Sequence, residues 1–209
     1  MRPLLCFGDS NTWGFNPENR ERYPYPLRWT SQLANHLGAD FSLLVEGLNG
    51  RTTCFDDPIE GKIKNGLRYL EMVLQSHKPL AGVILMLGTN DLKARFNQRA
   101  FDIAQGVQKL VELCQQPQFS SGLAPEVLLV APAPILDIEA TREKLAGGVA
   151  KGQQLAHYYR QVAETTGCRF LDAGQHVSAD PRDGVHLSIE SHHTLARVLA
   201  EYLRREIWP

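Results

Sequence analysis

Residues 1–10, MRPLLCFGDS, form a short apolar run that ends at Gly8 and is followed directly by Asp9 and Ser10. A run of this length, apolar on both faces and stopped by glycine, is typical of a buried strand in a parallel sheet. Ser10 is therefore expected just beyond the carboxyl end of a strand. In open α/β sheets this is the edge at which ligands bind.

Similar apolar runs alternate with longer amphipathic stretches along the rest of the chain. The expected strands are Pro3–Phe7, Phe41–Glu46, Gly82–Leu87, Val127–Ala131 and Cys168–Leu171. The expected helices are Leu27–Leu37, Asn65–Ser76, Arg99–Cys114, Gly148–Thr166 and Ile189–Glu206. The alternation predicts an α/β fold with helices on both faces of a five-stranded parallel sheet. A length of 209 residues suits one domain, residues 1–209.

The composition limits the partners that we expect. With 22 Lys and Arg against 23 Asp and Glu, the chain has no basic surplus to neutralise a nucleic-acid backbone. We expect no nucleic-acid partner and a small, neutral or weakly charged ligand. No stretch has the pattern of a signal peptide or of a membrane span, so no membrane partner and a cytoplasmic location are expected.

The cysteines and histidines give no sign of a metal site. Cys6, Cys54, Cys114 and Cys168 are scattered singly, which favours reduced thiols. The adjacent pair His192 and His193 lies near an expected helix start, where both are predicted on the surface. Neighbouring helix residues point in different directions and make a poor ligand pair. The sequence therefore predicts neither a metal nor another cofactor.

Polar residues follow three of the expected strands, and a fourth polar loop precedes the last helix. These loops are Gly8–Asn11, Gly47–Thr53, Gly88–Asp91 and Asp180–His186. The carboxyl ends of parallel strands meet at one edge of a sheet, so we expect the loops to converge there.

The converging loops contain the groups that acyl transfer needs. A serine hydroxyl is a poor nucleophile until a base takes its proton, and that base must be oriented by a third group. His186 can serve Ser10 as the base, because its ordinary pKa lies near neutrality. Asp183, three residues earlier, can orient the imidazole. Asp180 is a rival for this role, but it lies six residues before His186 and its side chain would have to span a longer distance.

A reacting carbonyl also needs donors for the negative oxygen that develops on it. The backbone amides of Ser10 and Gly50 and the side-chain amide of Asn90 are placed to supply three. Ser10 and Asn90 also suit a helix cap and a turn, and Gly50 suits a strained backbone position. Asp9 is expected to brace the loops by hydrogen bonds and not to act in catalysis.

Taken together, the motifs Gly8-Asp9-Ser10, Gly50, Gly88-x-Asn90-Asp91 and Asp183-x-x-His186 resemble the SGNH (GDSL) hydrolase family. The stretches around Ser10, Gly50, Asp57 and Asn90 are similar to its bacterial arylesterase and acyltransferase branch. The resemblance implies a three-layer, flavodoxin-like fold and an acyl-enzyme on Ser10. It also implies short-chain, often acetyl, ester substrates and homo-oligomers, commonly octamers. Asn11 departs from the leucine that the family name expects. The resemblance therefore predicts no detail of the acyl pocket beside this residue.

Several functions fit this pattern. The favoured one is a serine carboxylic-ester hydrolase without a cofactor. The same acyl-enzyme also suits transfer to an alcohol or peroxide, or release of acetate from acetylated sugars. A non-catalytic binding module would have no need for the full set of polar groups. A nucleotide binder is disfavoured because no glycine-rich phosphate motif follows the first strand.

Aromatic residues near the nucleophile suggest a pocket wall. Trp13, Phe15 and Phe55 lie on two of the loops and are candidate substrate-binding residues. Packing between the loops or a subunit contact explains them equally well. The proline and aromatic stretch Tyr23–Trp29 is interpreted as an oligomer contact.

Overall fold

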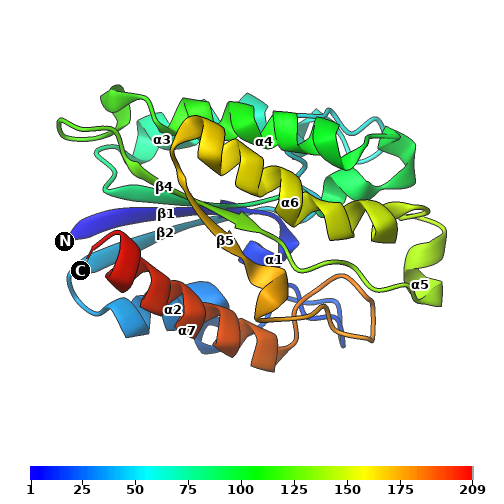
Figure 1. The fold of residues 1–209 in the computed structure, drawn as a ribbon. Coiled ribbons are helices and arrows are strands. Elements are labelled where there is room, and N and C mark those ends of the chain that lie inside the picture. Colours follow the sequence, from blue (N-terminus) through cyan, green and yellow to red (C-terminus); the bar gives the residue numbers. More distant parts are fainter. Residues whose placement is uncertain (209) are drawn as a thin grey trace.

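A computed structural model describes residues 1–208 and has an α/β fold (Figure 1). The strands are β1 (Arg2–Gly8), β2 (Phe41–Gly47), β3 (Gly82–Met86), β4 (Glu126–Ala131) and β5 (Arg169–Asp172). The α-helices are α1 (Ser10–Trp13), α2 (Trp29–Leu37), α3 (Gly66–His77), α4 (Ala100–Cys114), α5 (Glu139–Arg142), α6 (Gly148–Thr166) and α7 (Ile189–Glu206).

The five strands form one parallel sheet in the order β2-β1-β3-β4-β5. This order is the flavodoxin-like one, in which the chain reverses its direction of winding between β1 and β3. β1 lies between β2 and β3, where Phe7 pairs with Glu46 of β2 and Leu85 of β3. The loops after β1 and β3 therefore diverge and leave a crevice at the carboxyl edge of the sheet.

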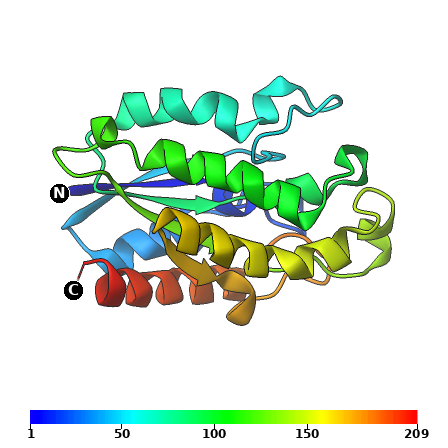
Figure 2. The same ribbon diagram turned by 45° about the horizontal axis from the view of Figure 1, so that its top comes forward.

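Helices cover both faces of the sheet and make three layers (Figures 1 and 2). Alternate residues of a strand point to opposite faces. Leu5 and Phe7 accordingly pack with α3, α4 and α6, whereas Leu4 and Cys6 pack with α2 and α7. The apolar runs of the inner strands β1, β3 and β4 are thus buried on both sides, which fixes the register of the sheet and the position of the loops at its edge.

The first turn after β1 packs very closely on the sheet. A Cβ atom at Gly8 would collide with the side chain of Thr12, and one at Gly47 would collide with the backbone of Trp13. The two glycines let α1 start directly at the sheet edge, with Ser10 as its first residue.

The predicted five-stranded α/β fold is confirmed, and all five predicted helices are present. Two of them, Gly148–Thr166 and Ile189–Glu206, have the predicted bounds. The helix expected from Leu27 begins at Trp29, because a short 3₁₀ turn containing Pro26 precedes it. The four-residue helices α1 and α5 were not predicted.

Two sequence-based interpretations are wrong. His192 is fully buried, and its Nδ1 accepts a hydrogen bond of 3.1 Å from the backbone N–H of Trp29. Trp29 and Tyr23, expected at an oligomer contact, are buried inside the chain. Only the rings facing outward, such as Tyr25 at 65% exposure, remain for such a contact.

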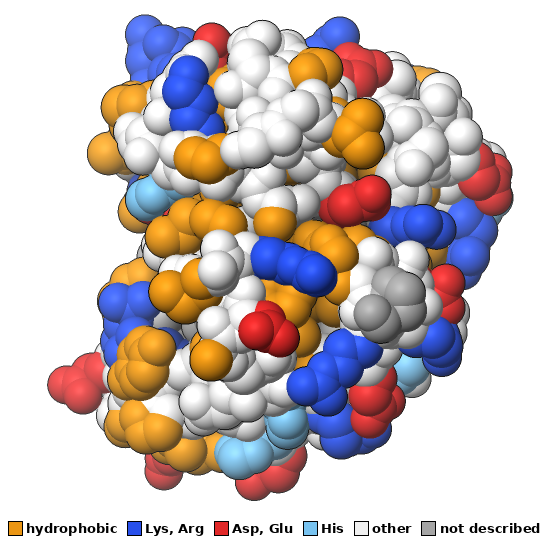
Figure 3. Space-filling view, turned by 90° about the vertical axis from the view of Figure 1, so that its left-hand side faces the viewer, with side chains coloured by type: hydrophobic (Ala, Val, Ile, Leu, Met, Phe, Trp, Pro, Cys, Tyr) orange, Lys and Arg blue, Asp and Glu red, His pale blue; other side chains and the backbone are white. Residues whose placement is uncertain are grey.

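The face at the amino ends of the strands carries hydrophobic side chains interspersed with charged ones (Figure 3). It lies opposite the edge where the polar loops converge. Among the helices of residues 1–208, none has the length and apolar character needed to cross a membrane.

Candidate active site

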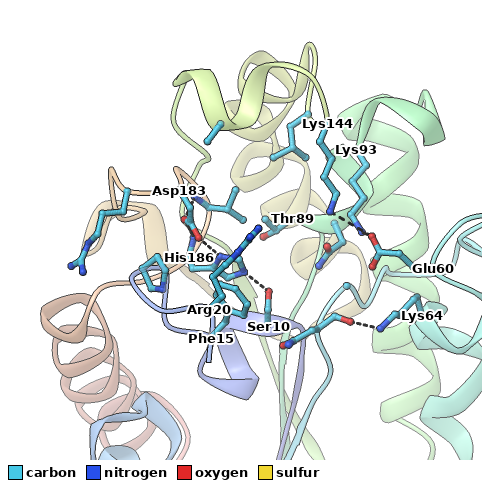
Figure 4. Close-up of a pocket in the computed structure, with 18 of the residues that line it drawn as sticks. Ser10, Phe15, Arg20, Glu60, Lys64, Thr89, Lys93, Lys144, Asp183 and His186 are labelled. Atoms are coloured by element: carbon cyan, nitrogen blue, oxygen red, sulfur yellow. Dashed lines mark hydrogen bonds and ion pairs between the residues drawn. The ribbon is translucent and has the colours of Figure 1, made fainter. Parts of the chain in front are cut away.

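The polar loops converge as predicted and line one cavity of about 610 Å³ at the carboxyl edge of the sheet (Figure 4). Ser10 comes from the start of α1, Gly50 from the loop after β2 and Asn90 from the turn after β3. Asp183 and His186 come from the loop before α7.

Ser10, His186 and Asp183 form an unbroken chain of hydrogen bonds. The Nε2 atom of His186 lies 2.9 Å from the Ser10 hydroxyl, and its Nδ1 atom lies 2.6 Å from Oδ2 of Asp183. The other carboxylate oxygen of Asp183 accepts the backbone N–H groups of Val185 and His186, both at 2.9 Å. The ring of Phe15 stacks on the imidazole with centroids 4.0 Å apart. The imidazole is thereby held by hydrogen bonds at both ring nitrogens and by the Phe15 ring against one face.

Asp183 is suited to stay ionised in this position. Burial tends to raise its pKa, but the hydrogen bonds from His186 and the charge of the imidazolium hold it below the ordinary value. An ionised carboxylate fixes the proton on Nδ1 and leaves Nε2 free to accept one from Ser10.

Asp180, the rival acid, does not contact the imidazole. Its Oδ1 atom accepts hydrogen bonds from the backbone and the Nε atom of Arg182, at 2.9 Å and 3.0 Å. Its backbone N–H donates to the carbonyl of His186 at 2.7 Å. Asp180 therefore shapes the loop, and Asp183 holds the ring.

The three candidate oxyanion donors border the same cavity as Ser10. Gly50 has a φ of +81°, and a Cβ atom there would collide with the carboxylate of Glu60. The positive φ favours glycine, and a side chain there would also push Glu60 from its ion pairs with Lys93 and Arg95. The Asn90 side-chain amide lies 3.5 Å from Oδ2 of Asp9, so the buried acid helps to orient it.

Only one of the three candidate substrate-binding residues lines the cavity. Phe15 borders the cavity, but Trp13 and Phe55 are not among the residues that line it. Arg22 lies over the Trp13 ring at 5.0 Å, and Phe55 faces Phe96 with centroids 6.4 Å apart. Both of these rings are held by loop packing, the alternative that the sequence had left open.

The sequence model of the GDSL-like lipase/acylhydrolase family matches residues 6–193. The chain belongs to this family. Its fold is also very similar to solved structures. A carbohydrate acetylesterase, Est24 from Sinorhizobium meliloti, and the native aryl esterase of M. smegmatis each share 39% identity with a TM-score of 0.92. The alignment covers 98% of this chain and 99% of theirs.

A putative arylesterase from Agrobacterium tumefaciens is 37% identical, with a TM-score of 0.88 over 98% of this chain and 99% of that one. The resemblance to the arylesterase branch is thus confirmed. A search of the curated proteins gave no match.

Asn11 has a role that the name of the GDSL-like family does not suggest. Its Oδ1 atom accepts the backbone N–H of Leu187 at 3.0 Å, and its Nδ2 atom donates to the carbonyl of Val185 at 3.4 Å. These two residues flank His186. The asparagine that stands in place of the family's leucine therefore ties the segment after Ser10 to the segment around His186. The sequence analysis noted the departure but not its use.

A second set of contacts that the sequence did not predict joins the other loops. Asp91 is fully buried and accepts the backbone N–H and, at 2.6 Å, the hydroxyl of Thr53. Arg51 lies under the site, where it donates to the carbonyls of Gly8, at 2.8 Å, and Glu46. A charged residue in the short loop after an apolar strand, four positions beyond Leu87, was the available signal for Asp91.

Two buried acids behind the site have raised pKa values. Burial raises the pKa of Asp9 to about 6, although a hydrogen bond from Asn11 and the charge of His186 lower it. Burial raises the pKa of Asp91 to about 7, against the hydrogen bonds from Thr53 and with a further increase from the Asp9 charge. Both acids belong to the converging loops, with their side chains buried, and neither forms a hydrogen bond with His186 among the described residues.

We predict that Asn11→Leu lowers the free energy of unfolding by about 1–3 kcal/mol, because the buried N–H of Leu187 loses its acceptor. Thr12→Val is the matched control, since the Thr12 hydroxyl is buried without a hydrogen-bond partner among residues 1–208. Urea denaturation of both variants measures the difference. A stable Asn11→Leu protein, or an equal loss in Thr12→Val, would contradict the bridging role.

We predict that Asp91→Asn flattens the pH dependence of stability between about pH 4 and 7. The folded pKa of about 7 lies above the ordinary value of aspartate, so the folded state binds more protons than the unfolded state in this range. The contribution of Asp91 to the stability of the wild-type protein therefore falls as the pH rises through this range. Urea denaturation at several pH values tests this, and Asp40→Asn, an exposed acid, is the control. Equal slopes in Asp91→Asn and wild type would disprove it.

Proposed function

We propose that the protein is a serine ester hydrolase in which Ser10 is the nucleophile, His186 the general base and Asp183 the orienting acid. Ester hydrolysis is the activity that its family and its similar structures support. The single observation that carries the residue roles is the hydrogen-bond chain of 2.9 Å and 2.6 Å through the imidazole. A binding module would gain nothing from a serine aligned on a base in this way.

The proposed reaction has two halves. The Ser10 oxygen attacks the ester carbonyl while its proton moves to Nε2 of His186, and a tetrahedral intermediate forms. The amides of Ser10, Gly50 and Asn90 donate to its negative oxygen. His186 then gives the proton to the departing alcohol. In the second half, water attacks the carbonyl of the acyl-enzyme by the same steps. The carboxylic acid leaves and the Ser10 hydroxyl is restored.

The cavity favours a short acyl group. Most of the side chains that border it are polar or charged, with only scattered apolar ones such as Phe15, Val185 and Leu145. A long acyl chain would bury only part of its methylenes there and would gain only part of the stabilisation of about 0.8 kcal/mol that each fully buried CH₂ gives. Similar structures named for aryl esters and for acetylated carbohydrates support acetyl esters as substrates. Release of acetate from sugars is the second candidate, on the strength of the Est24 match.

Three further expectations stay predictions. Transfer of the acyl group to an alcohol or peroxide requires the same acyl-enzyme. Assembly into homo-oligomers would use exposed apolar side chains, among which Tyr25, Ile59 and Ile63 are 57–74% exposed. The cytoplasm is the expected compartment.

Ser10→Ala should lower kcat/KM for an aryl acetate by at least about 10³-fold, because no other group replaces the nucleophile. Ser121→Ala, on an exposed loop, is the control and should retain full activity. Spectrophotometric release of 4-nitrophenol measures both, and circular dichroism checks the fold. Retained turnover in a folded Ser10→Ala protein would reject the mechanism.

Acyl length should strongly affect the rate. We expect kcat/KM for 4-nitrophenyl acetate to exceed that for the octanoate by at least about tenfold, since the long chain finds little apolar surface. A series from acetate to octanoate tests this in one assay, and acetate release from acetylated oligosaccharides tests the sugar alternative. A maximum at octanoate would show that another surface receives the acyl chain.

A further inference from the structure

The cavity around Ser10 carries more positive than negative side chains. Its lining includes Arg20, Lys64, Lys93, Lys144 and Arg182 against Glu18, Glu60 and Asp183. The whole chain, in contrast, has a formal net charge of −1. The surplus of positive charge is therefore a local property of the cavity.

The acids in the lining are already paired. Asp183 is bound to His186, and Glu18 lies 3.1 Å from Arg182. Glu60 accepts from Lys93 at 2.8 Å and lies 3.5 Å from Lys144. Arg95, outside the lining, also binds this carboxylate, at 2.6 Å. Glu18 and Glu60 thus have cationic partners within residues 1–208, although Lys93 and Arg95 also bind Asp57. Asp183 is engaged by its hydrogen bond to the imidazole.

Arg20 and Lys64 have no such partner. Neither forms an ion pair with an acidic side chain in the part of the chain that the structure describes. Lys64 uses one of its three N–H groups, in a 2.7 Å bond to the carbonyl of Asn49. All of these residues border the cavity, and in the view of Figure 4 Arg20 is drawn on the side of Phe15 and His186, Lys64 on the side of Glu60 and Ser10 between the two.

The backbone at Arg20 supports a role for its side chain. Residues 15–22 form a closed turn, in which the Asn16 N–H donates to the Glu21 carbonyl and the Arg20 N–H donates to the Asn16 carbonyl, both at 2.9 Å. Arg20 has a φ of +65°, which glycine or asparagine would adopt at lower cost. A turn with an arginine in this conformation, with its side chain at the cavity, is the kind of local strain found at ligand sites.

We propose that the ester accepted by this cavity carries a carboxylate, bound mainly by Arg20 and secondarily by Lys64. The inference rests on the proposed function of Ser10 and names the substrate class for that site. A guanidinium binds a carboxylate through two parallel, charge-assisted hydrogen bonds, which fixes the orientation of the substrate. With cations on both sides of Ser10, the carboxylate could belong to the acyl part or to the alcohol part, and the experiment separates the two.

Each arm compares a charged ester with a neutral one of similar shape. For the acyl part, the pair is the 4-nitrophenyl monoester of succinate and 4-nitrophenyl 4-oxopentanoate. For the alcohol part, the pair is 4-acetoxybenzoate and 4-acetoxybenzamide. The measured quantity is the ratio of kcat/KM for the charged ester to that for the neutral one, after subtraction of the uncatalysed rates. Wild type is compared with Arg20→Gln, Lys64→Gln and the control Lys62→Gln, which removes the same charge outside the cavity lining.

The expected ratio is roughly ten or more in wild type for at least one arm, as a charge-assisted contact would give. It falls toward one in Arg20→Gln, falls less in Lys64→Gln and is unchanged in Lys62→Gln. Added salt lowers the wild-type ratio, because the cavity is open to screening ions. A wild-type ratio of one or less in both arms overturns the proposal, as does an equal fall in Lys62→Gln.

A failure of this inference is distinguishable from a failure of the proposed function. Hydrolysis of the neutral esters without a preference for the charged ones overturns only the inference. If wild type hydrolyses none of the four esters, the proposed function fails, and binding then decides the inference. Calorimetry with folded Ser10→Ala protein should show tighter binding of the charged ester than of the neutral one in at least one of the two pairs, and equal or weaker binding in both pairs overturns it.

Discussion

The hydroxyl of Ser10 and the imidazole of His186 are separated by 176 residues in sequence and by 2.9 Å in space, and the site depends on that one contact. A hydrogen bond of this length tolerates an error of only a few tenths of an ångström, so both loops must be fixed with respect to each other. The parallel sheet brings them to one edge. Asn11 then joins them by bonds on either side of His186, and the Asp183 carboxylate closes the turn from beneath.

The same requirement explains why charged groups are buried behind the loops. Asp91 holds the loop after β2 through Thr53, and Arg51 holds the ends of β1 and β2 through their carbonyls. Burying these groups costs stability, which is visible in the raised pKa of Asp91, at about 7, and in the lowered pKa of Arg51, at about 10. Removing either partner would leave a buried polar group unpaired. The site is therefore rigid where it meets the sheet and open on the cavity side.

The sequence predicted the sheet, the long helices and the convergence of Ser10, Asp183 and His186, because each depends on a strong local pattern or on the common geometry of parallel strands. It did not predict contacts that depend on which faces meet in three dimensions. His192 packs against Trp29 and Tyr23. It lies three residues before Leu195, on the buried stripe of α7, and the sequence analysis did not extend that spacing to it. The net charge of −1 led to the expectation of a neutral or weakly charged ligand. The surplus of positive side chains around the cavity shows that the net charge of the whole chain does not predict the local charge of its binding site.

The charges around Gly50 link binding to the proposed chemistry. The carboxylate of Glu60 lies so close to Gly50 that a Cβ atom there would collide with it. An unpaired negative charge at this point would oppose the oxyanion that the Gly50 amide is proposed to stabilise. Lys93, only 3% exposed, and Arg95 bind Glu60 at 2.8 Å and 2.6 Å and remove this penalty. Once Glu60 is neutralised, the charges of Arg20 and Lys64 are not offset, and the resulting positive field favours both an anionic substrate and the negative charge that develops during attack.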